Sequence, residues 1–225
     1  MRITDVRLEE REGSFCLHGS SDAFANALRT AMMRDVPVPA VTKGRVLKNT
    51  SPLPDDYIVH RAGLVPLRRK EGASEGSLTL RAEGEGKVYA GEMVGEEFCV
   101  AEEECLLAVL PKGGELHMEL TVETQTGKLH ARHNASVAAR YVRRTIGGPE
   151  RECFCESTGW GERCPLCGCE KRSIHLASAP CAHFFRFETT GSLTARELLQ
   201  QALASIRARV EAVRQAMLSF SSCKQ

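Results

Sequence analysis

Two runs of the sequence decide the fold: ANALRT at residues 25–30 and NTSPLPDDYIVHRAGLVPL at residues 49–67. The first run lies in a segment whose apolar residues recur at helical spacing from Phe24 to Met32, after serines that suit a helix N-cap. The second run predicts a short helix from Asp55 to Ala62, with acidic residues in its first turn and Gly63 at its end. Neither run contains an obvious nucleophile, general base or phosphate-binding loop. The pattern therefore predicts a docking platform rather than an active site.

Length and composition limit the classes of protein that fit. The chain has 225 residues, of which 26% are charged and 42% hydrophobic, as in ordinary globular proteins. Its 30 basic and 29 acidic residues leave a net charge of +1, so bulk binding of nucleic acid through phosphates is disfavoured and no sequence-specific DNA binding is expected. No run approaches the roughly 20 apolar residues that cross a bilayer, and the first residues lack the apolar core of a signal peptide. We therefore expect an intracellular protein with reduced thiols and no membrane contact.

The remaining pattern predicts an α+β fold with many short strands. A β-hairpin is expected between Ile3 and Leu17. The first helix buries Phe24, Ala27, Leu28, Ala31 and Met32, and it must end near residue 35, because prolines follow at positions 37 and 39. Further strands are expected at residues 41–48, 77–82, 106–110, 116–122, 136–144 and 184–188, and a loop at 127–132.

The last element is a long helix over residues 195–220. Thr194 and Glu197 have the spacing of a capping box. Apolar residues then recur at alternating steps of four and three, which makes a narrow seam along one face. The seam consists of Leu199, Leu203, Ile206, Val210, Val213, Met217 and Phe220. Such a seam packs either on the chain's own sheet or against a partner chain, and its length on a C-terminal element favours the partner.

The cysteine cluster within residues 151–183 predicts a metal site. Cys153 and Cys155 are separated by one residue and Cys164 and Cys167 by two, and four thiolates satisfy tetrahedral zinc. Four further residues are alternative ligands: Cys169, His175, Cys181 and His183. The other interpretations are an iron–sulfur cluster, which also takes four thiolates, a redox pair, and unliganded thiols. Since every ligand comes from the protein, we expect a structural zinc that stabilises a loop without a core of its own.

These motifs resemble, in the same order, the alpha-like subunits of cellular RNA polymerase: bacterial alpha, the archaeal D-type subunit and the eukaryotic third subunit. The resemblance rests on ANALR at 25–29, NTSxLPDxxIxHRxGLxPL at 49–67, GKxHA at 127–131 and GSL at 191–193 before the long helix. It covers about residues 1–220. By this resemblance the chain is a non-catalytic assembly subunit of a DNA-dependent RNA polymerase built from several subunits, with no catalytic residues of its own.

The resemblance also implies a domain organisation and partners. A dimerisation domain, formed by a sheet and two helices, is expected at residues 1–40 and 141–225, interrupted by an inserted β-rich domain at 41–140. A small L-like (eleventh-subunit) protein is the expected heterodimer partner, and the chain is expected to dock on the second-largest subunit and meet other small polymerase subunits. Its location would be the nucleus in a eukaryote, or the cytoplasm in an archaeon or for a cytoplasmic virus.

Individual residues receive partner-binding roles from the same resemblance. Asn26 and Arg29 lie on the helix that faces the second-largest subunit. Four residues belong to motifs that face the same neighbour or hold the inserted domain in place: His60, Arg61, Lys128 and His130. For His60 and Arg61 a local cap and salt bridge on the short helix is the alternative. The long helix contributes Leu199, Leu203, Ile206, Val210, Val213 and Met217.

The cysteine cluster departs from the family pattern. Eukaryotic third subunits carry zinc cysteines inside the inserted domain, and many archaeal members carry a ferredoxin-like iron–sulfur module after it. Here the cluster follows the insert but is too short for that module, so a single zinc loop fits better. The alternative function is a free-standing zinc-loop protein that binds nucleic acid or regulates. It would use basic residues of the loop, with Trp160 as the one ring placed to stack on a base.

Overall fold

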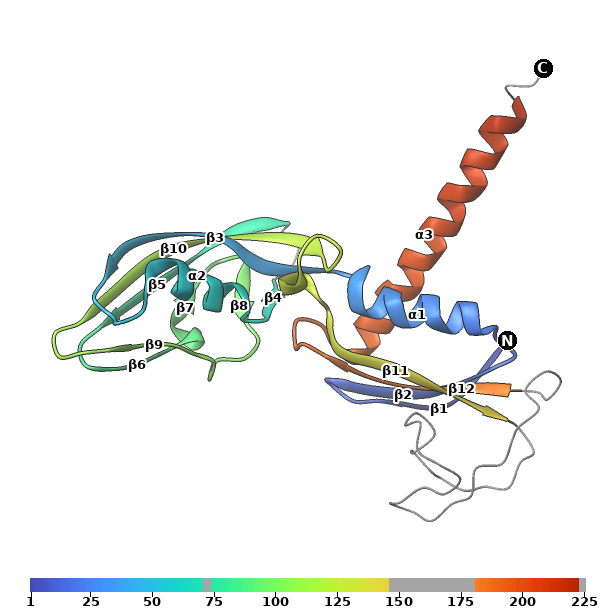
Figure 1. The fold of residues 1–225 in the computed structure, drawn as a ribbon, viewed down its shortest axis with the longest axis horizontal. Helices are drawn as coiled ribbons and strands as arrows, with labels where there is room; N and C mark the ends of the chain where they lie inside the picture. Colours follow the sequence, from blue (N-terminus) through green and yellow to red (C-terminus); the bar gives the residue numbers. More distant parts are fainter. Residues whose placement is uncertain (71–73, 146–180, 223–225) are drawn as a thin grey trace, which may run out of the picture.

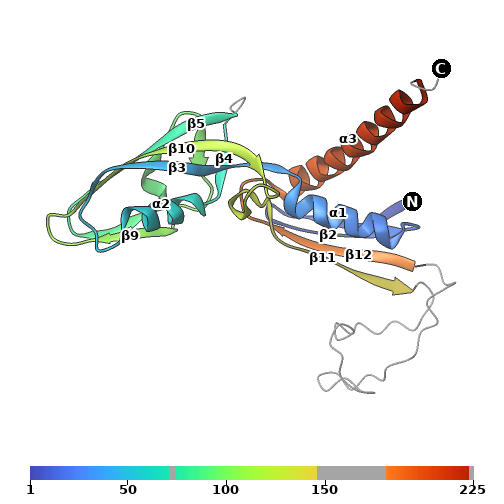
Figure 2. The same cartoon turned by 45° about the horizontal axis from the view of Figure 1, so that its top comes forward.

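The computed structural model describes residues 1–70, 74–145 and 181–222, which form two lobes lying end to end (Figure 1). We call the first lobe the body. Its antiparallel sheet has the order β1 (Arg2–Leu8), β2 (Glu12–His18), β12 (Cys181–Thr189), β11 (Ser136–Thr145). The helices α1 (Asp22–Arg34) and α3 (Ala195–Ser222) belong to the same lobe. Figure 2 shows α1 lying over one face of the sheet while α3 extends away from it.

The second lobe, which we call the β-rich lobe, is built around another antiparallel sheet. Its order is β3 (Pro37–Asn49), β10 (Glu115–Thr126), β5 (Glu75–Glu83), β7 (Met93–Val94). Two smaller sheets pair β4 (Leu67–Arg69) with β8 (Phe98–Val100), and β6 (Gly86–Tyr89) with β9 (Leu106–Leu110). The helix α2 (Asp55–Gly63) and the short turn η1 (Ala90–Glu92) lie in this lobe, and η2 (Ala131–His133) lies at the junction with the body. The expected mixed α+β class with antiparallel sheets is confirmed.

Each lobe has its own hydrophobic core. In the body, Phe15 of β2 stacks on Phe185 of β12, with their ring centroids 4.7 Å apart, and both are buried with Leu28 of α1 and Leu198 of α3. In the β-rich lobe, Ile58 of α2 is buried against side chains of the main sheet. The two sets of core side chains form separate clusters, so each lobe folds around different residues.

Helix α1 begins and ends where the sequence predicts. The Ser21 side chain accepts a hydrogen bond from the backbone N–H of Phe24 at 3.2 Å, and Asp35 is the C-cap residue. The buried face differs from the expected one at three positions. Ala25 is fully buried, whereas Phe24 and Ala27 are half-buried. Ala27 borders an open groove beside α3.

Strand β3 is longer than the sequence predicts. The expected start at Val41 is wrong, since β3 begins at Pro37 and includes Pro39. Proline cannot donate to a strand ladder, but β3 is an edge strand, where proline is tolerated. As a consequence β3 runs from one core into the other, with Val38 buried in the body and Val41 buried in the β-rich lobe.

The chain returns to the body between β10 and β11. The last paired residue of β10, Thr126, lies opposite Pro37, so the two crossings run side by side. The segment expected as a loop contains η2. A Cβ at Gly127 would overlap Oδ1 of Asn134, so a larger residue there would require the Asn134 side chain to move. The boundary expected at residue 140 falls inside β11, which begins at Ser136 in the body sheet.

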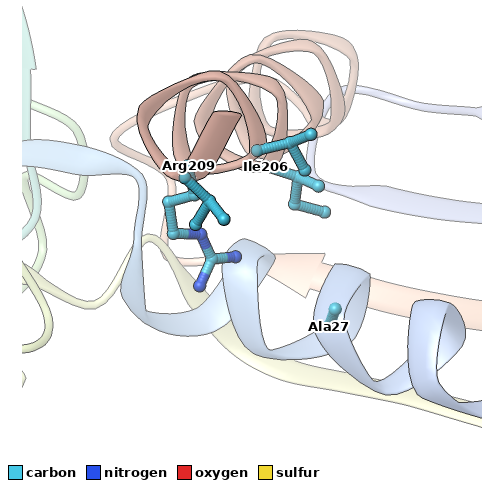
Figure 3. Close-up of a pocket in the computed structure, with 5 residues that line it drawn as sticks. Ala27, Ile206 and Arg209 are labelled. Carbon is cyan, nitrogen blue, oxygen red and sulfur yellow. The ribbon is translucent and has the colours of Figure 1, made fainter. Parts of the chain in front are cut away.

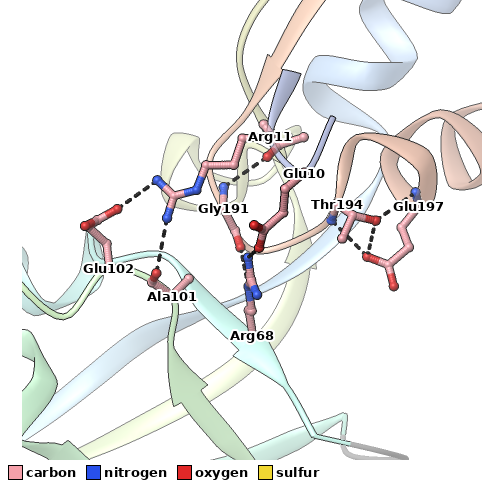
Figure 4. A network of polar contacts seen from close by, with 9 residues as sticks. Glu10, Arg11, Arg68, Ala101, Glu102, Gly191, Thr194 and Glu197 are labelled. Atoms are coloured by element: carbon pink, nitrogen blue, oxygen red, sulfur yellow. Dashed lines mark hydrogen bonds and ion pairs between the residues drawn. The ribbon is translucent and has the colours of Figure 1, made fainter. Parts of the chain in front are cut away.

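Polar contacts also join the two lobes, and each lobe contributes one arginine that donates to the other lobe (Figure 4). Arg11 of the body donates to the Glu102 carboxylate at 2.8 Å and to the Ala101 carbonyl oxygen at 3.3 Å. Arg68 of the β-rich lobe donates to the Glu10 carboxylate and to the Gly191 carbonyl oxygen, both at 2.8 Å. Glu102 and Glu10 remain exposed to solvent, so each ion pair adds little to the free energy of unfolding. These contacts set an orientation more than they add stability.

Candidate partner-binding site

Helix α3 is covered by its own chain only over its first turns, as far as the described residues show. The predicted capping box is confirmed: the Thr194 N–H donates to the Glu197 carboxylate at 2.8 Å, and the Glu197 N–H donates to Thr194 Oγ1 at 3.3 Å. Ala195, Leu198 and Ala202 are buried in the body. Beyond Ala202 no described side chain of the helix is fully buried, and its C-terminal part extends away from the sheet (Figures 1 and 2). No helix among the described residues has the length and apolar character of a membrane span.

The predicted seam on α3 divides into a packed part and an exposed part. Leu199 and Ile206 pack against the body core. The exposed fractions of the other side chains are 40% for Leu203, 63% for Val210, 61% for Val213 and 66% for Met217. A row of large aliphatic side chains exposed on one helix face is typical of a protein–protein contact. The second half of α3 therefore offers an apolar surface for a partner.

An open groove continues this surface towards α1 (Figure 3). Ala27, Ile206, Arg209, Val210 and Val213 line the groove, which has a volume of about 370 Å³. Its lining is aliphatic except for the Arg209 guanidinium. A groove of this kind suits the apolar face of another helix.

Asn26 and Arg29 lie together on the outer side of α1. Arg29 Nε and Nη2 donate to Asn26 Oδ1 at 3.2 and 3.0 Å, because residues three apart are neighbours on a helix surface. Arg29 Nη1 also lies 3.4 Å from Met33 Sδ. The pair presents an amide and a guanidinium in a fixed arrangement at the surface.

Helix α2 places its two basic residues differently. The Arg61 guanidinium donates to the Leu106 carbonyl oxygen of β9 and lies 5.8 Å from the centroid of the Tyr57 ring. Arg61 therefore ties α2 to the rest of the β-rich lobe. His60 is exposed, so its ring is accessible to another molecule.

The GKLHA segment at residues 127–131 makes contacts at the junction between the two lobes. Lys128 Nζ lies 2.9 Å from the Asp35 carboxylate at the end of α1. His130 Nδ1 accepts a hydrogen bond from the backbone N–H of Arg132 at 3.1 Å, and Arg132 Nη1 donates to the Val41 carbonyl oxygen at 2.7 Å. Lys128 and His130 thus have contacts within the chain, and their partner-binding roles stay predictions.

His133 is a buried residue to which the sequence pattern assigns no role. Its Nδ1 lies 3.0 Å from the Val38 carbonyl oxygen, so this nitrogen carries the proton and donates. Burial lowers the pKa of His133 from its ordinary value, although the hydrogen bond to Val38 acts in the opposite direction. A neutral ring is therefore held where the two lobes join. A lone histidine in a loop has no periodic pattern, so no spacing could have predicted this role.

Acidification is expected to destabilise the fold through His133. Because the folded-state pKa lies below the unfolded value of about 6.5, the unfolded chain binds more protons in the window below that value. The contribution of His133 to the free energy of unfolding is fully present above the pKa of the unfolded state. It is lost as the pH falls through the pKa of the folded state. Urea unfolding between about pH 7.5 and about pH 5 should show a falling free energy of unfolding, with a smaller slope in His133→Gln. Equal slopes in the two proteins would contradict this assignment.

The predicted metal ligands Cys153, Cys155, Cys164 and Cys167 lie outside the described residues. The alternative ligands Cys169 and His175 lie outside the described residues as well, and Cys181 and His183 belong to strand β12. The His183 side chain is buried, with Nδ1 2.7 Å from Ser20 Oγ and Nε2 2.7 Å from Asp22 Oδ1. Both ring nitrogens have partners within the described residues, and the metal site with its ligands stays a prediction. Within the described part of the chain, no three His, Cys, Asp or Glu side chains are grouped to hold an ion.

Comparison with known families gives the class of the protein. Residues 14–210 match the model of the RNA polymerase Rpb3/Rpb11 dimerisation domain. This match spans most of the chain, and the chain belongs to that family.

Similar proteins are named as polymerase subunits. The chain is 28% identical over 239 residues to the DNA-directed RNA polymerase subunit Rpo3 of Natronomonas pharaonis, covering 96% of this chain and 97% of that protein. It is 28% identical over 255 residues to the Rpo3 subunit of Methanosarcina acetivorans, covering 94% and 96%. The Rpo3 subunit of Halobacterium salinarum is 33% identical over 141 residues, which are 60% of this chain and 57% of that one. The resemblance based on the four sequence motifs is confirmed.

Proposed function

We propose that the chain is a non-catalytic assembly subunit of a DNA-dependent RNA polymerase built from several subunits. The observation that carries this proposal is the exposed apolar half of α3, where Val210 and Val213 show more than half of their surface in a chain of a dimerisation-domain family. Full-length similarity to proteins named Rpo3 supports it. An assembly subunit needs large contact surfaces rather than reactive groups, which agrees with the character of the motifs.

The partner that suits α3 is a small protein that presents an apolar helix. The groove between α1 and α3 lies beside the exposed side chains, so an incoming helix contacts both at once. By family relationship this partner is the L-like, eleventh-type subunit. Burial of Val210, Val213 and Met217 under it would remove the apolar surface that the free chain leaves in water.

A second contact is proposed with the second-largest subunit. The Asn26–Arg29 pair and the exposed His60 offer directional donors, and arginine is favoured in polar interfaces. In this arrangement the β-rich lobe is the inserted domain, held at a fixed orientation by the Arg11 and Arg68 contacts with the body.

The cysteine cluster is proposed to hold one structural zinc through Cys153, Cys155, Cys164 and Cys167, with an iron–sulfur cluster as the alternative. Elemental analysis of the purified chain distinguishes them. The zinc proposal expects zinc close to one equivalent per chain. Iron with acid-labile sulfide would identify the cluster instead.

Co-expression with the L-like protein of the same genome tests the heterodimer. Native mass spectrometry should show a complex of one copy of each, whereas the chain expressed alone should self-associate through α3. The proposed heterodimer fails if the purified chain is a soluble monomer in which the amides of residues 203–217 are fully protected from hydrogen exchange in the absence of a partner.

A further inference from the structure

Asp35 is a buried carboxylate at the point where α1, α3 and the GKLHA segment meet. Its side chain exposes 2% of its surface. Two cations reach it from distant parts of the chain. Lys128 Nζ lies 2.9 Å from Oδ1, and Arg209 Nη2 lies 2.9 Å from Oδ2.

These ion pairs compensate an otherwise unfavourable burial. Neither oxygen of Asp35 has an aligned hydrogen-bond donor among the described residues, and the carboxylate sits at the C-terminal end of α1, where the helix dipole also opposes negative charge. The Lys128 and Arg209 side chains are 54% and 47% exposed. Loss of Asp35 would leave both cations hydrated, whereas loss of Arg209 would leave a buried charge partly uncompensated. Moving Arg209 away from Asp35 is unfavourable for the same reason, because it would leave the buried carboxylate partly uncompensated.

Arg209 lies between the buried start of α3 and its exposed C-terminal part. It lies about 10 Å along the helix from Ala202, the last residue buried in the body, and the rest of α3 up to Ser222 extends about 20 Å further. A contact at this level extends the attachment of α3 to the body beyond Ile206, the last residue of the seam that packs against the body core. Figure 3 shows Arg209 reaching from α3 towards the end of α1, beside the aliphatic lining of the groove.

We propose that Asp35 is a positioning residue: by holding Arg209 it fixes the angle at which α3 leaves the body, and it keeps the guanidinium at the wall of the groove. Lys128 pairs with the other carboxylate oxygen of Asp35. The GKLHA segment therefore helps to fix the orientation of α3, the helix that carries the apolar face. The consequence for partner affinity rests on the proposed function, but the effect on α3 does not.

Distance measurements by double electron–electron resonance test this role in the full chain. The spin labels are attached at Ala23 on α1 and Ala216 on α3 through genetically encoded azide residues, because the chain has 10 native cysteines. The unmodified pair should give one narrow distance distribution. Asp35→Asn and Arg209→Ala should each shift and broaden it, and Arg209→Lys should restore most of the narrow peak. Arg214→Ala, which removes an exposed arginine of the same helix, is the control and should leave the distribution unchanged.

Hydrogen exchange measures folding and the mobility of α3 separately from partner binding. Exchange protection of amides in β2 and β12 should remain as in the wild type, while exchange in residues 206–214 should rise by about tenfold in Asp35→Asn. Should Asp35→Asn lose sheet protection, Arg209→Ala, which changes a half-exposed side chain, decides the question. Distributions equal to the wild type in Arg209→Ala overturn the proposal, whether or not the L-like partner binds. A shifted helix in a chain that binds no polymerase subunit would leave the positioning role standing and remove the proposed function.

Discussion

Val213→Asp is expected to weaken heterodimer formation strongly while leaving the fold intact. Val213 is 61% exposed and lines the groove beside α1, so its side chain contributes little to the core of the free chain. In the complex the same position would be desolvated, and the nearest cation of the groove, Arg209, is already paired with Asp35. The expected loss is about 2 kcal/mol or more, or roughly thirtyfold or more in Kd.

Ala208→Asp is the matched control. Ala208 is exposed on α3 and, by helical periodicity, faces away from the seam. Both variants add one carboxylate to the same helix, so the change in net charge is the same. Calorimetric titration with the L-like partner should give wild-type affinity for Ala208→Asp, and urea unfolding of both variants should stay within about 1 kcal/mol of the wild type. Wild-type binding by Val213→Asp would show that the partner does not use this face.

Phe185→Ala is expected to cause the largest loss of stability. The Phe185 ring is fully buried, stacks on Phe15 at 4.7 Å between centroids and lies 5.4 Å from the Tyr141 ring. Removing it leaves a cavity among rings of three adjacent strands, and these strands cannot collapse without losing register. The expected loss is about 3–5 kcal/mol in the free energy of unfolding, measured by urea titration.

Phe184→Ala is the comparison for this variant. Phe184 is the preceding residue of β12, so it points to the opposite face of the sheet, where it is only half-buried. The same truncation there should cost about 1 kcal/mol. Equal losses in the two variants would mean that the body core is not on the α1 side of the sheet.

Local signals in the sequence were sufficient for the first and last helices. The Ser21 cap and the Thr194–Glu197 capping box depend on residues within one turn, and both are present. The strand beginning at Pro37 could not be predicted in this way, because proline is acceptable there only for an edge strand, which is a property of the whole sheet. The contact between Arg11 and Glu102 is also invisible in sequence, since two charged surface residues this far apart carry no pattern.

The candidate site was predictable in outline but not in detail. The apolar period of α3 indicated its seam, but the pattern does not change at Ala202, where the helix leaves the body. Asp35 had no signal at all. A carboxylate at a helix C-terminus is locally unfavourable, and the two cations that compensate it come from residues 128 and 209.

The composition of the complex recovered with the tagged chain from its native organism tests the central claim most directly. If the chain is an assembly subunit, affinity purification should recover the two large polymerase subunits and one small L-like protein in equal amounts. Recovery of the chain alone, or with nucleic acid and without polymerase subunits, would contradict the account.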